Sequence, residues 1–265
     1  MMKKIVFLMF IAVVGYSCAT VPVTGRKQLS LISNSELLPM SYTNYKGVLD
    51  SANISSNKQQ ADMVKRVGVK IQKAVEDFMA QNNASSHLDG YDWEFNLIDE
   101  NVANAWCMPG GKVAFYTGIM PICKDETGVA VVMGHEVAHA IANHGAERMS
   151  QGLVQQMGGA ALDVALASKP NETRALFGVA YGVASNYGAV LPFSRLHESE
   201  ADKMGLIFMA MAGYDPREAP KFWERMASQG GGAAPPEFMS THPSHETRIK
   251  ELNEQIPEAM KYYKE

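Results

Sequence analysis

Cysteine is scarce in this sequence, and neither an excess of positive charge nor an internal repeat is present. The 24 basic side chains are outnumbered by 28 acidic ones, so the charge balance offers nothing for binding nucleic acid. The missing repeat excludes a solenoid. Of the three cysteines, Cys18 stands apart near the N-terminus. Cys107 and Cys123 then either form one disulfide or serve as small buried hydrophobic residues.

Hydrophobic runs long enough to cross a membrane are also lacking. The apolar run over 5–15 has 11 residues, well short of the ~20 that a membrane-spanning helix needs. Two lysines precede this run and Cys18 follows it, which is the pattern of a secretory signal peptide over 1–17. A small residue before such a cysteine is typical of a bacterial lipoprotein, in which Cys18 becomes the acylated N-terminus. Because Gly15 and Ser17 are uncommon at their positions in such signals, ordinary secretion stays the alternative.

The residue after the cysteine bears on location. Ala19 differs from the aspartate that typically retains lipoproteins in the inner membrane, so we expect an outer-membrane lipoprotein that faces the periplasm, attached through lipid on Cys18. The polar and mixed stretch 18–59 is predicted to be a tether and an N-terminal wrapping segment. Hydrophobic residues make up 46% of the sequence, enough for a buried core, and 60–265 is predicted to be the folded domain.

The first part of this domain combines helix and strand patterns. Apolar residues recur at spacings of three and four from Gln60 to about Gln81, which predicts an amphipathic helix. Alternation over 93–98 and again over 112–117 predicts two strands, with a turn signal at 109–111 before the second. We therefore expect an α+β fold, mainly helical, with a small antiparallel sheet.

The rest of the chain is predicted to be helical. One helix is expected to have Thr127 as its cap and to run to about Asn143, with Gly145 beyond its end. The region 146–190 is rich in small and apolar residues, so we interpret it as close-packed core helices interrupted near 169–171. Further helices are expected from His197 or Glu198 to before Gly213, over 216–228, and from Ser244 to about Lys261, with a mobile loop over 230–236.

The segment His135-Glu136-Val137-Ala138-His139 carries the strongest chemical signal. Its two histidines are four residues apart, so they share one helix face and can bind a single cation, which zinc suits. Glu136 reaches the adjacent side, where it can take a proton from a metal-bound water whose pKa zinc lowers to about 7. The alternative is a buried helix whose histidines are hydrogen-bonded core residues.

A third ligand is needed, and the sequence excludes one common arrangement. Metzincins require glycine at 142 and histidine at 145, where this chain has Ala142 and Gly145. His144 is one place out of register, and we interpret it as a surface or helix-end histidine. The remaining route is a carboxylate from a later helix, as in catalytic zinc sites with two histidines and one glutamate.

An acidic segment over 197–202 supplies candidates for this carboxylate. Glu198 and Asp202 are four residues apart and share a helix face, whereas Glu200 points elsewhere. The spacing favours Glu198 as the ligand and leaves Glu200 as the alternative. Asp202 can then orient a histidine by accepting a hydrogen bond from its second ring nitrogen. A solvated acidic face is the other interpretation of this segment.

Four ordered motifs resemble metallopeptidase family 48, which includes HtpX, the CAAX prenyl protease and BepA-like periplasmic proteases. The match covers residues 60–255. The motifs are the helix with the two histidines, the acidic segment, Asn104-Ala105 followed by Pro109-Gly110-Gly111, and Thr241-His242-Pro243 with Arg248.

This resemblance implies a zincin-like metallopeptidase domain with the small sheet beside the helix that carries the histidines. It implies one Zn²⁺ per chain, held by His135, His139 and Glu198. Glu136 would be the general base that activates water and later protonates the departing amine. The family's spacing of a glutamate and an aspartate selects Glu198 rather than Glu200 as the ligand.

The resemblance also assigns residues around the metal. Asn104 and Ala105 are similar to the family's edge strand, which can hold an extended substrate as an added β-strand. His242 and Arg248 are similar to a downstream pair that stabilises the oxyanion. In BepA-like relatives the residue that matches His242 can also bind the metal and hold the enzyme inactive. A surface histidine and a surface arginine are the plainer interpretation of this pair.

The sequence departs from the membrane-spanning branches of that family and from those with a helical-repeat extension, so it is most similar to the short lipoprotein branch. We expect a zinc-dependent endopeptidase of the bacterial envelope. Its partners would be misfolded or unassembled periplasmic and outer-membrane polypeptides, and no nucleic acid. The alternative is a periplasmic chaperone or assembly factor with a structural or self-inhibited zinc site.

Overall fold

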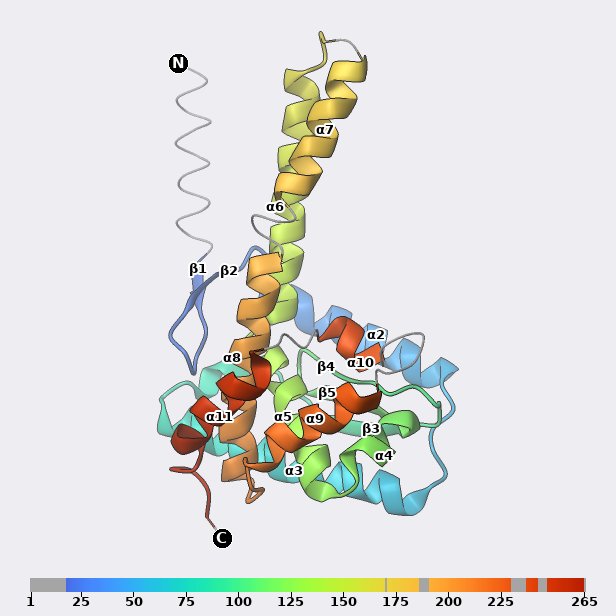
Figure 1. Ribbon diagram of the computed structural model, residues 1–265, viewed down its shortest axis with the longest axis vertical. Coiled ribbons are helices and arrows are strands. Elements are labelled where there is room, and N and C mark those ends of the chain that lie inside the picture. Colours follow the sequence, from blue (N-terminus) through green and yellow to red (C-terminus); the bar gives the residue numbers. More distant parts are fainter. Residues whose placement is uncertain (1–17, 170, 186–190, 230–236, 243–246, 265) are drawn as a thin grey trace.

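The structure, a computed structural model, describes residues 18–169, 171–185, 191–229, 237–242 and 247–264 (Figure 1). Three expectations fall outside these residues: the signal peptide over 1–17, the mobile loop over 230–236, and Ser244 as the cap of the last helix.

The chain enters the fold through a small antiparallel hairpin of β1 (Cys18–Thr20) and β2 (Lys27–Leu29). Helix α2 (Asn34–Ser51) follows and lies against the central sheet, where the hydroxyl of Tyr45 donates to the carbonyl oxygen of Val113 at 2.8 Å. The stretch predicted to be a tether and wrapping segment therefore contains regular structure that packs on the domain. Its boundary at residue 59 stays a prediction.

The amphipathic pattern that begins near Gln60 forms α3 (Lys58–Gln81), and the predicted helix is confirmed. Its apolar side chains are buried in the core, because spacings of three and four put them on one face. A short 3-10 helix, η1 (Ser85–Leu88), leads from α3 to the sheet. The buried apolar residues of α3 are Val64, Val67, Ile71, Val75, Phe78 and Met79.

The central sheet has the strand order β3-β5-β4, formed by β3 (Glu94–Ile98), β4 (Ala105–Met108) and β5 (Lys112–Tyr116). The α+β, mainly helical fold class is confirmed, with one difference in the sheet. The two predicted strands β3 and β5 run parallel, and only β4 and β5 are antiparallel. The expectation that these two strands are antiparallel was wrong because the chain reverses twice between them, through β4, the edge strand that the family resemblance places at Asn104 and Ala105.

Helix α5 (Glu126–Ile141) crosses α8 (Leu191–Met211) at the centre of the molecule (Figure 1). The backbones approach closely at Gly134 and Gly205: a Cβ on Gly134 would lie 2.8 Å from the carbonyl oxygen of Gly205. Two glycines here allow the two helices to bring their polar side chains together.

Both helices begin earlier than predicted. The cap of α5 is Asp125, whose side chain accepts a hydrogen bond from the Gly128 amide at 3.0 Å, so the expectation for Thr127 was wrong. Asp125 was overlooked although aspartate is as good a cap as threonine. Helix α8 begins six residues before His197, because the acidic segment lies within the helix and not at its start.

Helices α6 (His144–Ala165) and α7 (Asn171–Ser185) form a hairpin that projects far from the rest of the molecule (Figure 1). The predicted interruption between them is present, but the prediction that 146–190 forms close-packed core holds only at the base of α6, where Ala146 and Ser150 are buried, and was wrong for the rest of the described part. Several large apolar side chains are exposed, among them Val164 at 78% and Leu176 at 68%. Composition alone does not tell whether an apolar helix faces protein or another medium.

The remaining helices surround the α5–α8 pair. They are η2 (Thr117–Ile119), α4 (Met120–Cys123), α9 (Glu218–Ser228), α10 (Glu237–Thr241) and α11 (Arg248–Ala259). Cys107 lies in β4 and Cys123 in α4, and both are free thiols, so they do not form the disulfide that the sequence left open. Within the described residues, no helix combines the length and apolar character that a bilayer span requires.

Candidate metal centre

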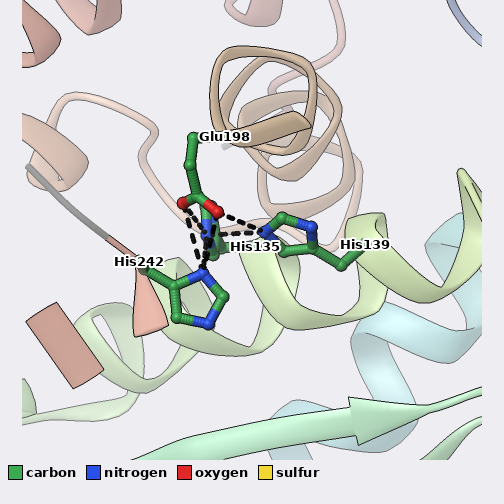
Figure 2. A group of neighbouring side chains, drawn as sticks. All are labelled: His135, His139, Glu198 and His242. Atoms are coloured by element: carbon green, nitrogen blue, oxygen red, sulfur yellow. Dashed lines mark hydrogen bonds and ion pairs between the residues drawn. The ribbon is translucent and has the colours of Figure 1, made fainter. Parts of the chain in front are cut away.

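Four buried side chains from three parts of the chain converge at the crossing of α5 and α8 (Figure 2). His135 and His139 lie one turn apart on α5, Glu198 lies on α8, and His242 follows α10. One ligand atom from each lies within 4.8 Å of all the others. The three predicted ligands are thus brought together, and His242 joins them as a fourth.

The distances within this group fit a tetrahedral cation site. Nε2 of His135 lies 3.1 Å from Nε2 of His139 and 3.2 Å from an oxygen of Glu198, and His139 lies 3.4 Å from that carboxylate. Nδ1 of His242 lies 3.2 Å from both Glu198 oxygens and from His135 Nε2. With ligand distances of about 2.0–2.1 Å, the corners of a tetrahedral zinc site are about 3.3–3.4 Å apart. The donor set therefore fits a metal ion such as zinc.

Glu136 faces a cleft beside this group. The cleft has a volume of about 280 Å³ and is lined by Glu136, His139 and His242 together with Trp106 and Cys107 of β4. Glu136 is buried, and burial raises the pKa of its carboxyl group. Its Oε1 lies 3.3 Å from Nε2 of His242. A carboxylate with a raised pKa beside a metal site is suited to accept a proton.

The side chains of the two candidate glutamates, Glu198 and Glu200, point in different directions from helix α8. Glu198 turns toward the histidines, and the pKa of its carboxyl group is far below its usual range: burial alone would raise it, and the three histidines outweigh that effect. Glu200 turns the other way and contacts His144 and Arg26 instead. The structure therefore brings Glu198 to the metal centre and leaves Glu200 outside it.

Asp202 and Arg248 lie behind the ligands. An oxygen of Asp202 lies 2.9 Å from Nδ1 of His135, which is the predicted orienting contact. Arg248 is fully buried, donates to Asp202 at 2.7 Å, and stacks 3.4 Å from the ring centre of Trp223. Its predicted part at the oxyanion stays a prediction, since the described contacts of Arg248 are with Asp202, Glu198, His135 and Trp223, and Arg248 does not line the cleft.

Asn104 and Ala105 lie where β4 begins, at the edge of the sheet that the prediction requires. Both are buried, and the amide of Asn104 donates to Glu237 at 3.0 Å, while Phe238 donates its backbone N–H to Ala103. These contacts attach α10, and with it His242, to the start of the edge strand. Contact of Asn104 with a substrate stays a prediction.

His144 is the residue that the sequence analysis misjudged most. It is fully buried, and its Nδ1 lies 2.8 Å from Nδ1 of His139, so the surface interpretation was wrong. His144 does lie at a helix end, which is the start of α6. Its burial could have been inferred from its position five residues after His139, directly after an asparagine that can form a sharp turn. Asn143 forms that turn, with φ of 54°. That turn folds His144 back onto the metal centre.

The described geometry can now be compared with known proteins. The sequence model of peptidase family M48 matches residues 67–256, which include every candidate metal ligand, Glu136 and Arg248. The chain belongs to peptidase family M48. The resemblance that the motifs carry is thereby confirmed at the level of the family.

Several M48 relatives are similar over part of their length. The mitochondrial metalloendopeptidase OMA1 of Schizosaccharomyces pombe is 39% identical over 181 residues, covering 66% of this chain and 50% of that protein. Human OMA1 is 28% identical over 247 residues, covering 91% of this chain and 46% of that protein. A putative beta-barrel assembly-enhancing protease of Vibrio cholerae is 31% identical over 167 residues, covering 60% of this chain and 34% of that protein. This M48 chain thus spans half or less of these relatives' length.

Proposed function

We propose that this chain is a zinc-dependent endopeptidase. The observation that carries the proposal is the convergence of His135, His139 and Glu198 beside the buried carboxylate of Glu136, at the wall of an open cleft. Both OMA1 and the beta-barrel assembly-enhancing protease are named as peptidases, which supports the same activity here. When bound, zinc supplies Lewis acidity that polarises a peptide carbonyl and lowers the pKa of water.

The chain's own residues supply the proton transfers. Glu136 is placed to take a proton from the attacking water and to deliver it to the amine that departs. Asp202 holds His135 through its second ring nitrogen, which fixes the ring and its tautomer. Arg248 holds Asp202 in turn, so a change at Arg248 or at Asp202 is transmitted to His135.

Strand β4 offers a place for the substrate. It is the edge strand of the central sheet, and its residues Trp106 and Cys107 line the same cleft as Glu136. An extended polypeptide can add to such an edge by backbone hydrogen bonds, with little demand on its sequence. This mode of binding favours unfolded or misfolded polypeptides as substrates, because a folded protein does not present an extended segment.

Two further features support a location at a membrane. Cys18, the predicted site of lipid attachment, is the first residue of β1, and the hairpin it begins packs against the base of α6, where Leu31 donates its N–H to Ser150 at 3.0 Å. The projecting α6–α7 hairpin carries most of the large apolar side chains that are exposed among the described residues. We propose that this hairpin lies against the lipid surface to which Cys18 is attached, and that the substrates are proteins of the bacterial envelope.

Removal of apolar side chains from the hairpin tests its contact with lipid. The chain from residue 18, with Cys18→Ser, should float with vesicles of phosphatidylcholine, and Val164→Glu with Leu176→Glu should weaken partitioning at least tenfold, since burial of a valine or leucine contributes about 1.5–3 kcal/mol. Gln156→Glu with Asn171→Asp adds the same charge at two exposed polar positions of the hairpin and serves as the control. Equal flotation of the apolar variants and the wild type would contradict the proposal.

A second candidate function rests on His242. With its Nδ1 among the ligands, the site has four protein donors, which is the arrangement of structural zinc. A periplasmic chaperone or assembly factor with a structural or self-inhibited zinc would have such a closed centre. The buried base Glu136 favours the peptidase, because a structural site has no use for it.

Zinc binding and cleavage of denatured casein, measured together, test the proposed function. Chelation should stop cleavage and added zinc should restore it. Glu198→Gln should raise the zinc Kd about a hundredfold, because four-ligand sites bind with about 10–16 kcal/mol in total and one ligand contributes roughly a quarter. Glu200→Gln changes the rejected ligand, which contacts His144 and Arg26 instead of the metal ligands, so it should raise the zinc Kd much less than Glu198→Gln and should still load at saturating zinc. Zinc affinity lost in Glu200→Gln but kept in Glu198→Gln would reverse the ligand assignment, and zinc-loaded wild type that never cleaves would favour the chaperone.

A further inference from the structure

A second buried polar group lies directly behind His139. We call it the Arg26 network, and its members are Arg26, His144, Glu147, His197 and Glu200. Four of them come from the helices α6 and α8 next to the metal centre, and His144, Glu147 and Glu200 are all at most 6% exposed. Arg26 comes from the loop of the β1–β2 hairpin, 121 residues before Glu147 in the sequence.

One branch of the network runs from Arg26 to the metal centre. Nε of Arg26 donates to Glu200 at 2.8 Å, and the same oxygen of Glu200 lies 3.0 Å from Nε2 of His144. Nδ1 of His144 lies 2.8 Å from Nδ1 of His139. Thr24 donates its hydroxyl to the other oxygen of Glu200, which fixes the orientation of the carboxylate.

These contacts determine which ring nitrogens carry protons. Nε2 of His139 faces the other ligands, so as a metal ligand His139 carries its proton on Nδ1 and donates it to His144. His144 then carries its own proton on Nε2 and donates it to Glu200. The orientation of each ring thus depends on the next group outward, and the series ends at a carboxylate that Arg26 holds.

The second branch keeps Arg26 itself in place. Its two terminal nitrogens donate to the two oxygens of Glu147 at 3.0 and 2.8 Å, and His197 contacts Glu147 at 2.8 Å. Burial alone would raise the pKa of Glu147, but the hydrogen bonds of His197 and Arg26 lower it to about 2. Two buried carboxylates share this one guanidinium, and a buried charge that loses its partner is strongly destabilising.

We propose that Arg26 is a positioning residue for the metal centre, acting through Glu200 and His144 on the ring of His139. The N-terminal hairpin is then a working part of the zinc site and not only a link to the membrane. This inference rests on the zinc site of the proposed function, and no residue of the network is placed in contact with substrate.

Zinc affinity of the mature chain, measured by competition with a chelator, tests the proposal. Arg26→Met should raise the zinc Kd about tenfold, at the lower end of the 10–100-fold effect of removing a partner of a metal ligand, because it acts through two intermediate groups. Arg26→Lys keeps the positive charge but loses the several N–H donors of the planar guanidinium. Its zinc Kd should therefore lie between those of the wild type and Arg26→Met. Arg66→Met is the matched control, since Arg66 likewise forms an ion pair with a helix glutamate, Glu126 of α5, away from the network.

A double-mutant cycle separates positioning from general stability. If Arg26 acts through Glu200, the double variant Arg26→Met with Glu200→Gln should have the same zinc Kd as Glu200→Gln alone. Additive effects on Kd, or a lowered Tm with unchanged Kd in Arg26→Met, would overturn the proposal. Wild type that binds zinc and cleaves casein alongside an unaffected Arg26→Met refutes this inference only, whereas wild type that binds no zinc refutes the proposed function.

Discussion

Replacement of Glu136 by glutamine should reduce the kcat for cleavage of denatured casein about 10³-fold while the bound zinc is retained. Glutamine has the shape of glutamate but cannot accept the proton of the attacking water. The loss corresponds to about 4 kcal/mol of transition-state stabilisation. Because Glu136 is not among the four converging donors, the Kd for zinc should change little.

The control for this result is Glu126→Gln, the same substitution ten residues earlier on the same helix. Glu126 pairs with Arg66 at the surface, so its change should leave cleavage within about twofold, as surface changes usually do. Retained cleavage by Glu136→Gln would assign the base elsewhere. A joint loss of zinc and cleavage would give Glu136 a structural part that its position in the cleft does not suggest.

The centre of the site could be predicted because its spacing is local. His135 and His139 share a helix face at any position in any fold, and so do Glu198 and Asp202. The residue spacing does not predict that helices α5 and α8 cross, and the close contact of Gly134 and Gly205 allows this crossing. The resemblance to a family was needed to choose Glu198 over Glu200, and the structure places both as that choice requires.

The surroundings of the site could not be predicted, because their contacts join distant parts of the chain. Arg26 reads as one polar residue in a mixed stretch, and nothing near it in the sequence indicates partners at 147 and 200. His144 was judged by the helix before it, whereas its burial depends on the turn at Asn143. Strand β4 was indicated only by the family resemblance at Asn104 and Ala105, because its four residues show too little alternation to indicate a strand.

His242 occupies two places that catalysis requires to be free. Its Nδ1 lies at the fourth corner of the metal centre, and its Nε2 lies 3.3 Å from the base Glu136. With a metal ion bound, the four protein donors would close the centre, and water would enter only if His242 left. The segment that carries His242 is attached to Asn104 and Ala103 at the start of the edge strand, so a polypeptide adding to β4 would act next to this attachment.

The variant His242→Ala should therefore cleave casein about tenfold faster than the wild type, because removal of one ligand opens a centre that is closed for most of the time. At the same time its zinc Kd should rise, since a donor is lost. If His242 instead stabilises the oxyanion, cleavage should fall about 10²–10³-fold and the zinc Kd should stay unchanged. The two roles predict opposite changes in rate, and only one of them predicts a rise in the zinc Kd, so one variant with paired assays of rate and zinc affinity decides whether His242 closes the site or takes part in the chemistry.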